Sequence, residues 1–263
     1  MCIKCGCATT GAASDRHHHE HPHDHDHAPR TVRVEEELLA KNDRLAAGNR
    51  SLFRQAGIFV LNLVSSPGSG KTTLLERTLR ELGGQLRFAV LEGDQQTSLD
   101  ADRIAATGVP VRQINTGAGC HLDAHMVGHG VEDFDLARTD ILMIENVGNL
   151  VCPAGFDLGE DHKVALLSVT EGEDKPLKYP QMFRAATLLL INKTDLLPHL
   201  DFDVERCKAF ARQVNPRIEI LELSCRSGAG MQGWYAWLDA GVKQKRRRET
   251  SSEKRETGNG KRG

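Results

Sequence analysis

The sequence predicts an α/β domain in three layers, with a mainly parallel sheet at its centre. Three observations carry this prediction: short apolar runs of strand length recur, the stretches between them are long enough for helices, and a glycine-rich turn follows the first run. Buried parallel strands read as continuous apolar runs, and helices connect them across the faces of the sheet. With 263 residues and 39% apolar content, the chain can bury one full-sized core.

Taken in order, the elements begin with one amphipathic helix at about 34–55, which Gly57 brings to an end. Its apolar residues at helical spacing are Val34, Leu38, Leu45, Leu52 and Phe53, with Leu39 beside them. Seven buried-type strands follow, at Ile58–Val64, Arg87–Leu91, Val111–Asn115, Ile141–Ile144, Val164–Val169, Leu188–Ile191 and Ile218–Leu223. Met231–Leu238 predicts a closing helix in which Trp234 and Trp237 pack into the core.

Two tails flank the predicted domain of residues 31–242. Residues 1–30 hold three cysteines and then seven histidines between His17 and His27, a composition that predicts a disordered, metal-binding tail. Residues 243–263 carry nine Lys or Arg against three Glu, which predicts a basic, disordered tail and leaves −8 of formal charge on residues 1–242 of a chain whose total is −2.

Charge and hydropathy also exclude classes of protein. The acidic body argues against nucleic acid as a partner. No apolar run is long enough to span a membrane, and the N-terminus lacks the apolar segment of a signal peptide. We therefore expect a cytoplasmic chain with no membrane partner.

The glycine-rich turn, Ser65–Thr73, joins the first strand to a helical pattern, as a phosphate-binding P-loop requires. We expect nucleoside triphosphate to bind Gly68, Ser69, Gly70, Lys71, Thr72 and Thr73, with Lys71 on the β- and γ-phosphates and the Thr72 hydroxyl on Mg²⁺. Ser65 departs from the usual motif, in which a glycine stands six positions before the lysine.

Acidic residues follow two other strands at the same predicted edge of the sheet. Glu92 and Asp94 come after Arg87–Leu91, and Glu145 comes after Ile141–Ile144. Mg²⁺ prefers hard oxygen ligands, so Asp94 and Glu145 beside Thr72 are candidate ligands, direct or through water. Either acid could instead cap a helix or lie in a solvated turn. With Lys71, these two acids form the predicted catalytic group.

The sequence Asn192-Lys193-Thr194-Asp195 follows the strand Leu188–Ile191, where α/β proteins bind ligands. A carboxylate at Asp195 can accept hydrogen bonds from guanine N1–H and its exocyclic amine, a donor pair that adenine lacks. Lys193 would pack its stem on the base, and Ser224 would approach it from the other side. The pattern predicts GTP or GDP as the nucleotide.

Two groups of cysteine and histidine suit soft metal ions. Cys2, Cys5 and Cys7 can wrap one ion on a short loop, since thiolates and imidazoles suit Ni²⁺, Zn²⁺ and Cu⁺; a redox Cys-x-x-Cys normally opens a helix of a thioredoxin-like domain, which is not predicted here. Cys120, His121 and Cys152 form a second set in loops on the nucleotide side. Buried thiols are the ordinary alternative, which we assign to Cys207 and Cys225.

Jointly these motifs resemble the HypB family, hydrogenase nickel-incorporation GTPases of the SIMIBI class. The segments that carry the resemblance are the Cys-x-x-Cys-Gly-Cys start, the histidine-rich tether, Ser65–Thr73, Glu92–Asp94, Asn115–Asp123, Glu145–Pro153 and Asn192–Asp195. The resemblance covers nearly all of the chain except the basic tail, and Ser65 agrees with the family. It implies slow Mg²⁺-dependent GTP hydrolysis. It matches Cys2, Cys5 and Cys7 to a tight nickel site, Cys120, His121 and Cys152 to a nickel or zinc site of the GTPase domain, and Asp94 to the acid associated with Mg²⁺ and water activation.

The same resemblance implies partners: a nucleotide-dependent homodimer, a HypA-type metallochaperone and the large-subunit precursor of a [NiFe]-hydrogenase. Three alternatives stay open. A urease-type nickel GTPase is disfavoured by the N-terminal motif and by Cys152-Pro153-Ala154 in place of Cys-Pro-His. A nickel store with a vestigial nucleotide domain is disfavoured by the intact Lys71, Thr72 and Asp195, and a SIMIBI ATPase by Asp195.

Overall fold

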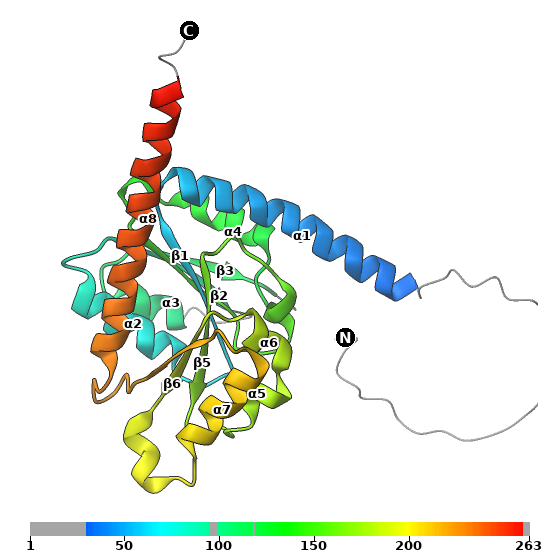
Figure 1. The fold of residues 1–263 in the computed structure, drawn as a ribbon, viewed down its shortest axis with the longest axis vertical. Helices are drawn as coiled ribbons and strands as arrows, with labels where there is room; N and C mark the ends of the chain where they lie inside the picture. Colours follow the sequence, from blue (N-terminus) through cyan, green and yellow to red (C-terminus); the bar gives the residue numbers. More distant parts are fainter. Residues whose placement is uncertain (1–29, 95–98, 118, 260–263) are drawn as a thin grey trace, which may run out of the picture.

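The computed structural model describes residues 30–94, 99–117 and 119–259 of the chain. Within them, one sheet has the strand order β3-β2-β4-β1-β5-β6-β7, and every neighbouring pair is parallel (Figure 1). The strands are β1 (Phe59–Ser65), β2 (Phe88–Asp94), β3 (Val111–Asn115), β4 (Ile141–Glu145), β5 (His162–Ser168), β6 (Leu188–Asn192) and β7 (Glu219–Glu222). The predicted strands and fold class are confirmed.

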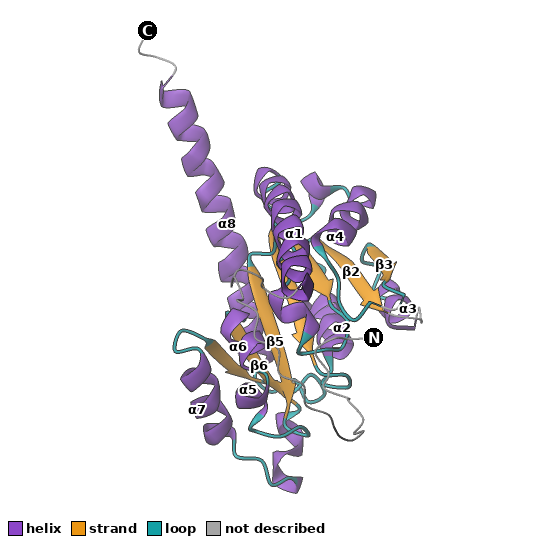
Figure 2. Ribbon diagram, turned by 90° about the vertical axis from the view of Figure 1, so that its right-hand side faces the viewer, coloured by secondary structure: helices purple, strands orange, loops and turns teal. Residues whose placement is uncertain are grey.

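Helices cover both faces of the sheet, which gives the three layers (Figures 1 and 2). On one face lie α2 (Lys71–Leu82), α3 (Leu99–Ala105) and α8 (Met231–Asn259), and on the other α1 (Arg30–Gln55), α4 (Ala124–Gly130), α5 (Lys175–Lys178), α6 (Pro180–Ala185) and α7 (Val204–Val214). Trp234 of α8 is fully buried and donates from Nε1 to Thr78 Oγ1 at 3.0 Å. Trp237 stacks on it, so the predicted packing of the two rings is confirmed.

Helix α1 forms where its periodicity predicts, but it buries a different face. Leu38 and Leu52 are 58% and 42% exposed, whereas Asn42 and Asn49 are 5% and 8% exposed. The asparagines are turned inward because their amides bind backbone groups of Ala124, at the start of α4, and of the loop at Asp157 and Leu158. Phe53 is buried as expected and joins the apolar cluster beneath α1 and α4.

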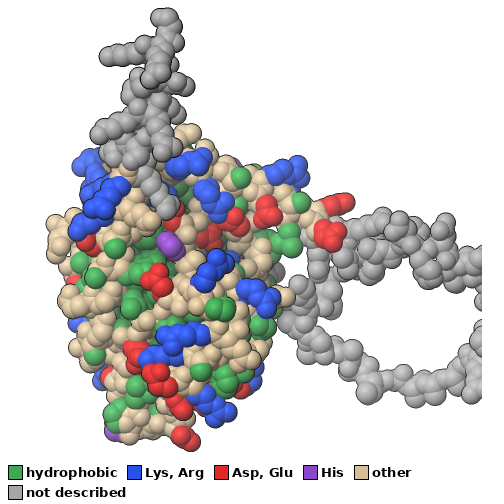
Figure 3. All heavy atoms as spheres, viewed as in Figure 1, with side chains coloured by type: hydrophobic (Ala, Val, Ile, Leu, Met, Phe, Trp, Pro, Cys, Tyr) green, Lys and Arg blue, Asp and Glu red, His purple; other side chains and the backbone are tan. Residues whose placement is uncertain are grey.

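The C-terminal segment differs from the predicted disorder, since α8 continues as a helix through Asn259. Lys and Arg have high helix propensity, and no proline interrupts the segment. Two ion pairs anchor it: Lys245 to Asp161 at 2.7 Å and Arg246 to Asp140 at 2.7 Å. Acidic and basic side chains are interspersed over this face of the molecule (Figure 3).

The carboxyl ends of the strands place the polar residues of interest along one edge. β2 extends through Asp94, so Glu92 and Asp94 lie in the strand itself and not beyond it. Glu145 and Asn192 are the last residues of β4 and β6. A separate observation is that no helix among the described residues combines the length and apolar character needed to cross a membrane.

Candidate nucleotide and metal site

The turn between β1 and α2 has the backbone that its glycines permit. Gly68 and Gly70 have φ of 74° and 102°, in the left-handed region. A Cβ on Gly70 would lie 2.6 Å from Asn192 Nδ2, so glycine is required there for space as well as for conformation. The turn delivers Lys71 and Thr72 into the first residues of α2, beside the partial positive charge of the helix N-terminus.

The contacts of Ser65 explain why a serine stands where the usual motif has a glycine. Its hydroxyl accepts a hydrogen bond from Lys71 Nζ at 2.9 Å and donates to Ser66 O at 2.7 Å. Burial lowers the pKa of Lys71, which is 9% exposed, while the carboxylate of Glu145 opposes that shift. The side chain that would meet the phosphates is therefore held at the loop by a hydroxyl that a glycine could not supply.

A group of buried carboxylates faces this loop. Thr72 Oγ1 donates to Glu145 Oε1 at 2.9 Å, and Glu92 lies opposite Glu145 in the pairing of β2 with β4. The Oε2 atoms of Glu92 and Glu145 are buried and have no hydrogen-bond partner within the part of the chain that the structure describes. Burial raises the pKa of Glu92 to about 8 and that of Glu145 to about 7, and mutual repulsion adds to the shift of Glu92.

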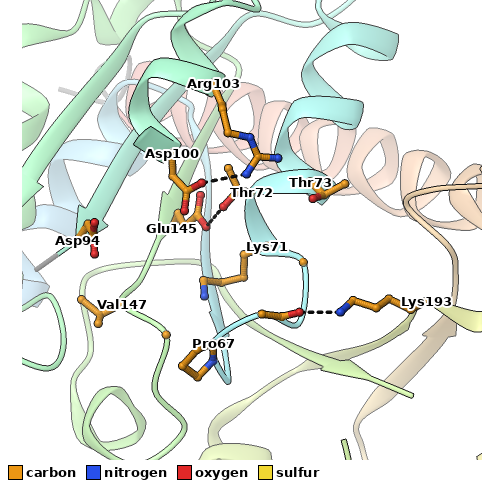
Figure 4. Close-up of a pocket in the computed structure, with 13 residues that line it drawn as sticks. Pro67, Lys71, Thr72, Thr73, Asp94, Asp100, Arg103, Glu145, Val147 and Lys193 are labelled. Atoms are coloured by element: carbon orange, nitrogen blue, oxygen red, sulfur yellow. Dashed lines mark hydrogen bonds and ion pairs between the residues drawn. The ribbon is translucent and has the colours of Figure 1, made fainter. Parts of the chain in front are cut away.

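Orphaned carboxylate oxygens beside a threonine hydroxyl fit Mg²⁺, which prefers hard oxygen ligands and keeps several waters. Thr72, Glu145 and Asp94 border one cavity of about 510 Å³, which Lys71 and Lys193 also line (Figure 4). Sequence reasoning missed Asp100 and Arg103 of α3 in this cavity. They follow no motif, and only the acidic first turn of α3 could have pointed to them.

The residues predicted to read the base lie at the end of β6 and in the loop after β7. Asp195 accepts a hydrogen bond from the Ser224 hydroxyl, and Lys193 Nζ donates to Gly68 O at 2.7 Å. Asn192 binds protein rather than solvent: Nδ2 donates to Ser69 O at 2.9 Å, and Oδ1 accepts from Cys225 N at 3.1 Å. One amide thus ties the phosphate loop to the loop that carries Ser224.

Cys120, His121 and Cys152 come together, although they lie on loops that follow two different strands. Their ligand atoms all lie within 4.8 Å of one another, and each residue is half-buried. Burial lowers the pKa of His121, which favours the neutral imidazole that binds metals. The His121 ring also packs against the Phe156 ring, with 3.9 Å between centroids.

Other predicted residues divide into two groups. Cys2, Cys5, Cys7 and the histidines from His17 to His27 lie outside the described residues. Cys207 and Cys225 are buried, and burial raises the pKa of each thiol to about 12, which suits packing rather than metal binding.

The fold and the loop geometry define a P-loop nucleotide-binding protein that carries a thiol and imidazole cluster. Comparison with known families gives the same class: residues 59–222 match the family described as "CobW/HypB/UreG, nucleotide-binding domain".

Individual relatives narrow the assignment. The chain is 67% identical over 210 residues to hydrogenase maturation factor HypB of Azotobacter vinelandii, an alignment that covers 80% of this chain and 69% of that protein. It is 62% identical over 210 residues to HypB of Escherichia coli K12, covering 80% and 72%. The chain belongs to the HypB hydrogenase maturation factors of this family.

Solved structures agree with that assignment. HypB from Helicobacter pylori in complex with nickel is 40% identical with a TM-score of 0.74, covering 78% of this chain and 96% of that one. HypB from Archaeoglobus fulgidus is 42% identical with a TM-score of 0.73, covering 77% and 99%.

Proposed function

We propose that this chain is a GTP-hydrolysing metallochaperone that binds nickel and delivers it to the large-subunit precursor of a [NiFe]-hydrogenase during maturation. One observation carries the proposal: a cluster of two thiols and one imidazole within 4.8 Å of one another lies on loops that leave the same sheet edge as the phosphate loop. Nickel as the cargo is supported by the similarity to HypB from Helicobacter pylori, whose solved structure is a complex with nickel.

The nucleotide is GTP or GDP. Asp195, Ser224 and Lys193 stand beyond the phosphate loop, and the Asp195 carboxylate can accept from the N1–H and amine of guanine. A site built around such an acceptor rejects a ligand without the matching donors by about 10⁴-fold or more. ATP is therefore a poor substrate.

Hydrolysis is slow and requires Mg²⁺, which Thr72, Glu145 and Asp94 would hold and which would neutralise charge on the β- and γ-phosphates. Lys71 and the backbone N–H groups of Gly68–Thr73 bind the phosphate oxygens. Asp94 positions the attacking water. Because burial raises the pKa of Glu145, its carboxyl group ionises readily only when a cation is near.

The metal cluster responds to the nucleotide. Three protein ligands leave a fourth position open for water, for a residue of a second copy of the chain or for a receiving protein. Cys152 lies seven residues beyond Glu145, so a rearrangement of Glu145 at the γ-phosphate alters the geometry of the three ligands. By linkage, if the nucleotide changes metal affinity by some factor, the metal changes nucleotide affinity by that same factor. The corresponding coupling free energy is typically about 1–3 kcal/mol.

The tail and the partners complete the proposal. Cys2, Cys5 and Cys7 hold one tight Ni²⁺, and the histidine tract adds weaker capacity. A GTP-dependent homodimer brings two metal clusters together, a HypA-type metallochaperone exchanges the metal, and Zn²⁺ competes for the domain cluster. All of this takes place in the cytoplasm.

The decisive experiment follows nickel from the full chain to a purified hydrogenase large-subunit precursor, with GTP, GDP or ATP present. Transfer should require GTP, and Cys152→Ser should reduce it at least about 10-fold. Cys207→Ala is the matched control, since that thiol is buried in α7 and is not part of the metal cluster, and it should transfer normally. Equal transfer with and without nucleotide would refute the proposal.

A further inference from the structure

The sheet face beneath α1 and α6 carries buried polar residues between two apolar clusters. One cluster lies under α1 and α4, and the other under α6 and α7. Between them are Asn62, Asn146, Glu160 and Lys163, here called the polar seam. Asn62 and Asn146 are 0% and 1% exposed, and the side chains of Glu160 and Lys163 are 7% and 8% exposed.

One end of the polar seam joins the nucleotide cavity to the loop of Cys120 and His121. Asn146 directly follows Glu145, and its Oδ1 accepts from Leu122 N at 3.0 Å and from Val147 N at 3.0 Å. Leu122 directly follows His121. A displacement of the end of β4 therefore acts on the backbone next to this metal-binding loop.

The middle of the seam crosses β1. Asn146 Nδ2 donates to Asn62 Oδ1 at 3.2 Å, and Asn62 Nδ2 donates to Glu160 Oε1 at 3.1 Å. The second oxygen of Glu160 accepts from Leu158 N at 2.6 Å. The backbone N–H groups of Leu122 and Val147 fix the orientation of the Asn146 amide, and the direction of the bond to Asn62 follows from it.

The other end of the seam holds the loop of Cys152. Lys163 Nζ donates to Pro153 O at 2.8 Å and to Phe156 O at 3.0 Å, and it lies 3.8 Å from Glu160 Oε1. Pro153 directly follows Cys152, and the Phe156 ring packs on His121. The polar seam thus binds backbone groups of both metal-carrying loops, through Asn146 at one end and Lys163 at the other.

Burying these charged side chains costs free energy, so the polar seam is a poor way to stabilise the fold. Burial raises the pKa of Glu160 and lowers that of Lys163, so each charge is disfavoured where it lies. Replacing a buried ion pair by apolar side chains is often neutral or stabilising, and the seam is flanked by apolar clusters on both sides. We therefore look for a role of these polar side chains other than stabilising the fold.

We propose that the polar seam is the positioning network of the metal cluster: it fixes the loops of Cys120-His121 and Cys152 relative to each other and carries a displacement of Glu145 to both. The inference rests on the proposed nucleotide-gated function and names the residues that would execute it. None of the four belongs to the metal cluster or lines the nucleotide cavity. Asn146 and Lys163 act through the backbone groups that they bind, and the other two side chains connect them.

The test uses the full chain with free Zn²⁺ fixed by nitrilotriacetate, so that the N-terminal tail does not change the free concentration. Bound thiolates alkylate slowly, and mass spectrometry of the Cys152 peptide after iodoacetamide treatment reports occupancy at this site alone. The Zn²⁺ concentration for half-protection should differ about 5-fold or more between GDP and a non-hydrolysable GTP analogue.

Two single variants and their combination make the test specific. Asn62→Asp places two carboxylates together, and Glu160→Gln places an amine against a donor, so each breaks one link. Each should bring the ratio close to 1, while GTP affinity measured without Zn²⁺ stays unchanged. The double variant restores one donor and one acceptor at that link and should recover the ratio. Asn215→Ala is the control, because Asn215 Nδ2 binds backbone oxygens near α6, including Ala186 O at 2.8 Å; it should keep the ratio.

The outcomes separate the two ideas. No nucleotide dependence in the unchanged chain would overturn the gated function, and the inference with it. Nucleotide dependence that persists in both single variants would overturn the inference alone, as would a double variant that behaves like the single ones.

Discussion

Asp195 is the side chain on which the proposed preference for guanine nucleotides depends. It lies in the 3₁₀ helix Thr194–His199 after β6 and accepts a hydrogen bond from Ser224. Asp195→Asn replaces one acceptor oxygen by a donor amine, which would face the donors of a bound guanine. We expect the preference for GTP over ATP, measured as the ratio of kcat/KM values, to fall by about 10²-fold or more.

The matched control for this change is Asp239→Asn, since Asp239 is an exposed residue of α8 that pairs with Lys243. It should leave the ratio unchanged. Comparable hydrolysis of ATP and GTP by the unmodified chain would contradict the assignment of Asp195.

Glu92 and Glu145 make the stability of the nucleotide-free chain depend on pH. Their pKa values are about 8 and about 7 in the fold, against an ordinary value of 4.5. Protons therefore leave these two groups first in the unfolded chain, and their contribution to the free energy of unfolding falls as pH rises from about 4.5 to 8. The lowered pKa of Lys71 acts in the opposite direction. The lowered pKa of His121 acts in the opposite direction only below about 6.5.

Thermal unfolding without nucleotide or Mg²⁺ should accordingly give a higher Tm at pH 6.5 than at pH 8. Glu92→Gln removes one of the two ionisations and should shrink the difference, and Mg²⁺ with GDP should do the same by compensating the charge. A Tm that rises between pH 6.5 and pH 8 would show that these carboxyls ionise normally in the fold.

At the scale of elements, α1 is held by polar contacts as much as by apolar ones. Asn49 Nδ2 donates to Ala124 O at 2.8 Å and to Leu158 O at 3.0 Å, while Leu52 is 42% exposed. Asn49→Ala removes two hydrogen bonds from a buried position, so it should lower the free energy of unfolding by about 1–3 kcal/mol. Leu52→Ala should change it by about 0.5 kcal/mol or less.

Urea unfolding of the two variants gives both values directly. A larger loss for Leu52→Ala than for Asn49→Ala would mean that α1 packs through the leucine face that its sequence periodicity suggests.

The contrast within α1 shows what sequence patterns can and cannot predict. Strands such as β1 and β6 were predictable because burial on both faces gives continuous apolar runs, and the phosphate loop because its chemistry dictates its spacing. The inward asparagines of α1 and Asn62 in the middle of β1 contradict the apolar rule, since their partners are groups more than 80 positions away in some cases. No local pattern encodes such pairing.

The short distance between Cys152 and the pair Cys120 and His121 is also hard to predict from local sequence, but the order of the strands predicts part of it. The loops follow β3 and β4, which lie on either side of β2 and so share its carboxyl edge. Their proximity could be expected, whereas the distances among the ligand atoms depend on hydrogen bonds such as that of Asn146 to Leu122.

At the scale of the whole molecule, the proposed tight Ni²⁺ site and the nucleotide cavity belong to different parts of the sequence. We expect a full chain with Cys2→Ser, Cys5→Ser and Cys7→Ser to lose its tightest Ni²⁺ site while its rate of GTP hydrolysis stays within about 2-fold. The reason is that the cavity is lined by residues between Pro67 and Lys193.

Isothermal titration with Ni²⁺ under reducing conditions, paired with a phosphate-release assay, measures both quantities. The reverse variant, Lys71→Ala, should abolish hydrolysis and keep the tight Ni²⁺ site. Loss of hydrolysis together with the three N-terminal thiols would contradict the separation.

The anchoring of α8 has a practical consequence for measurements on this chain. Asp140 and Asp161, which pair with Arg246 and Lys245, directly precede β4 and β5, at the edge of the sheet opposite the cavity and the thiol cluster. Figure 2 shows α8 projecting away from the domain at that end. A chain attached to a biosensor surface through its C-terminal end would thus present both binding sites to the flowing solution, and partner binding could be followed without the surface competing for either site.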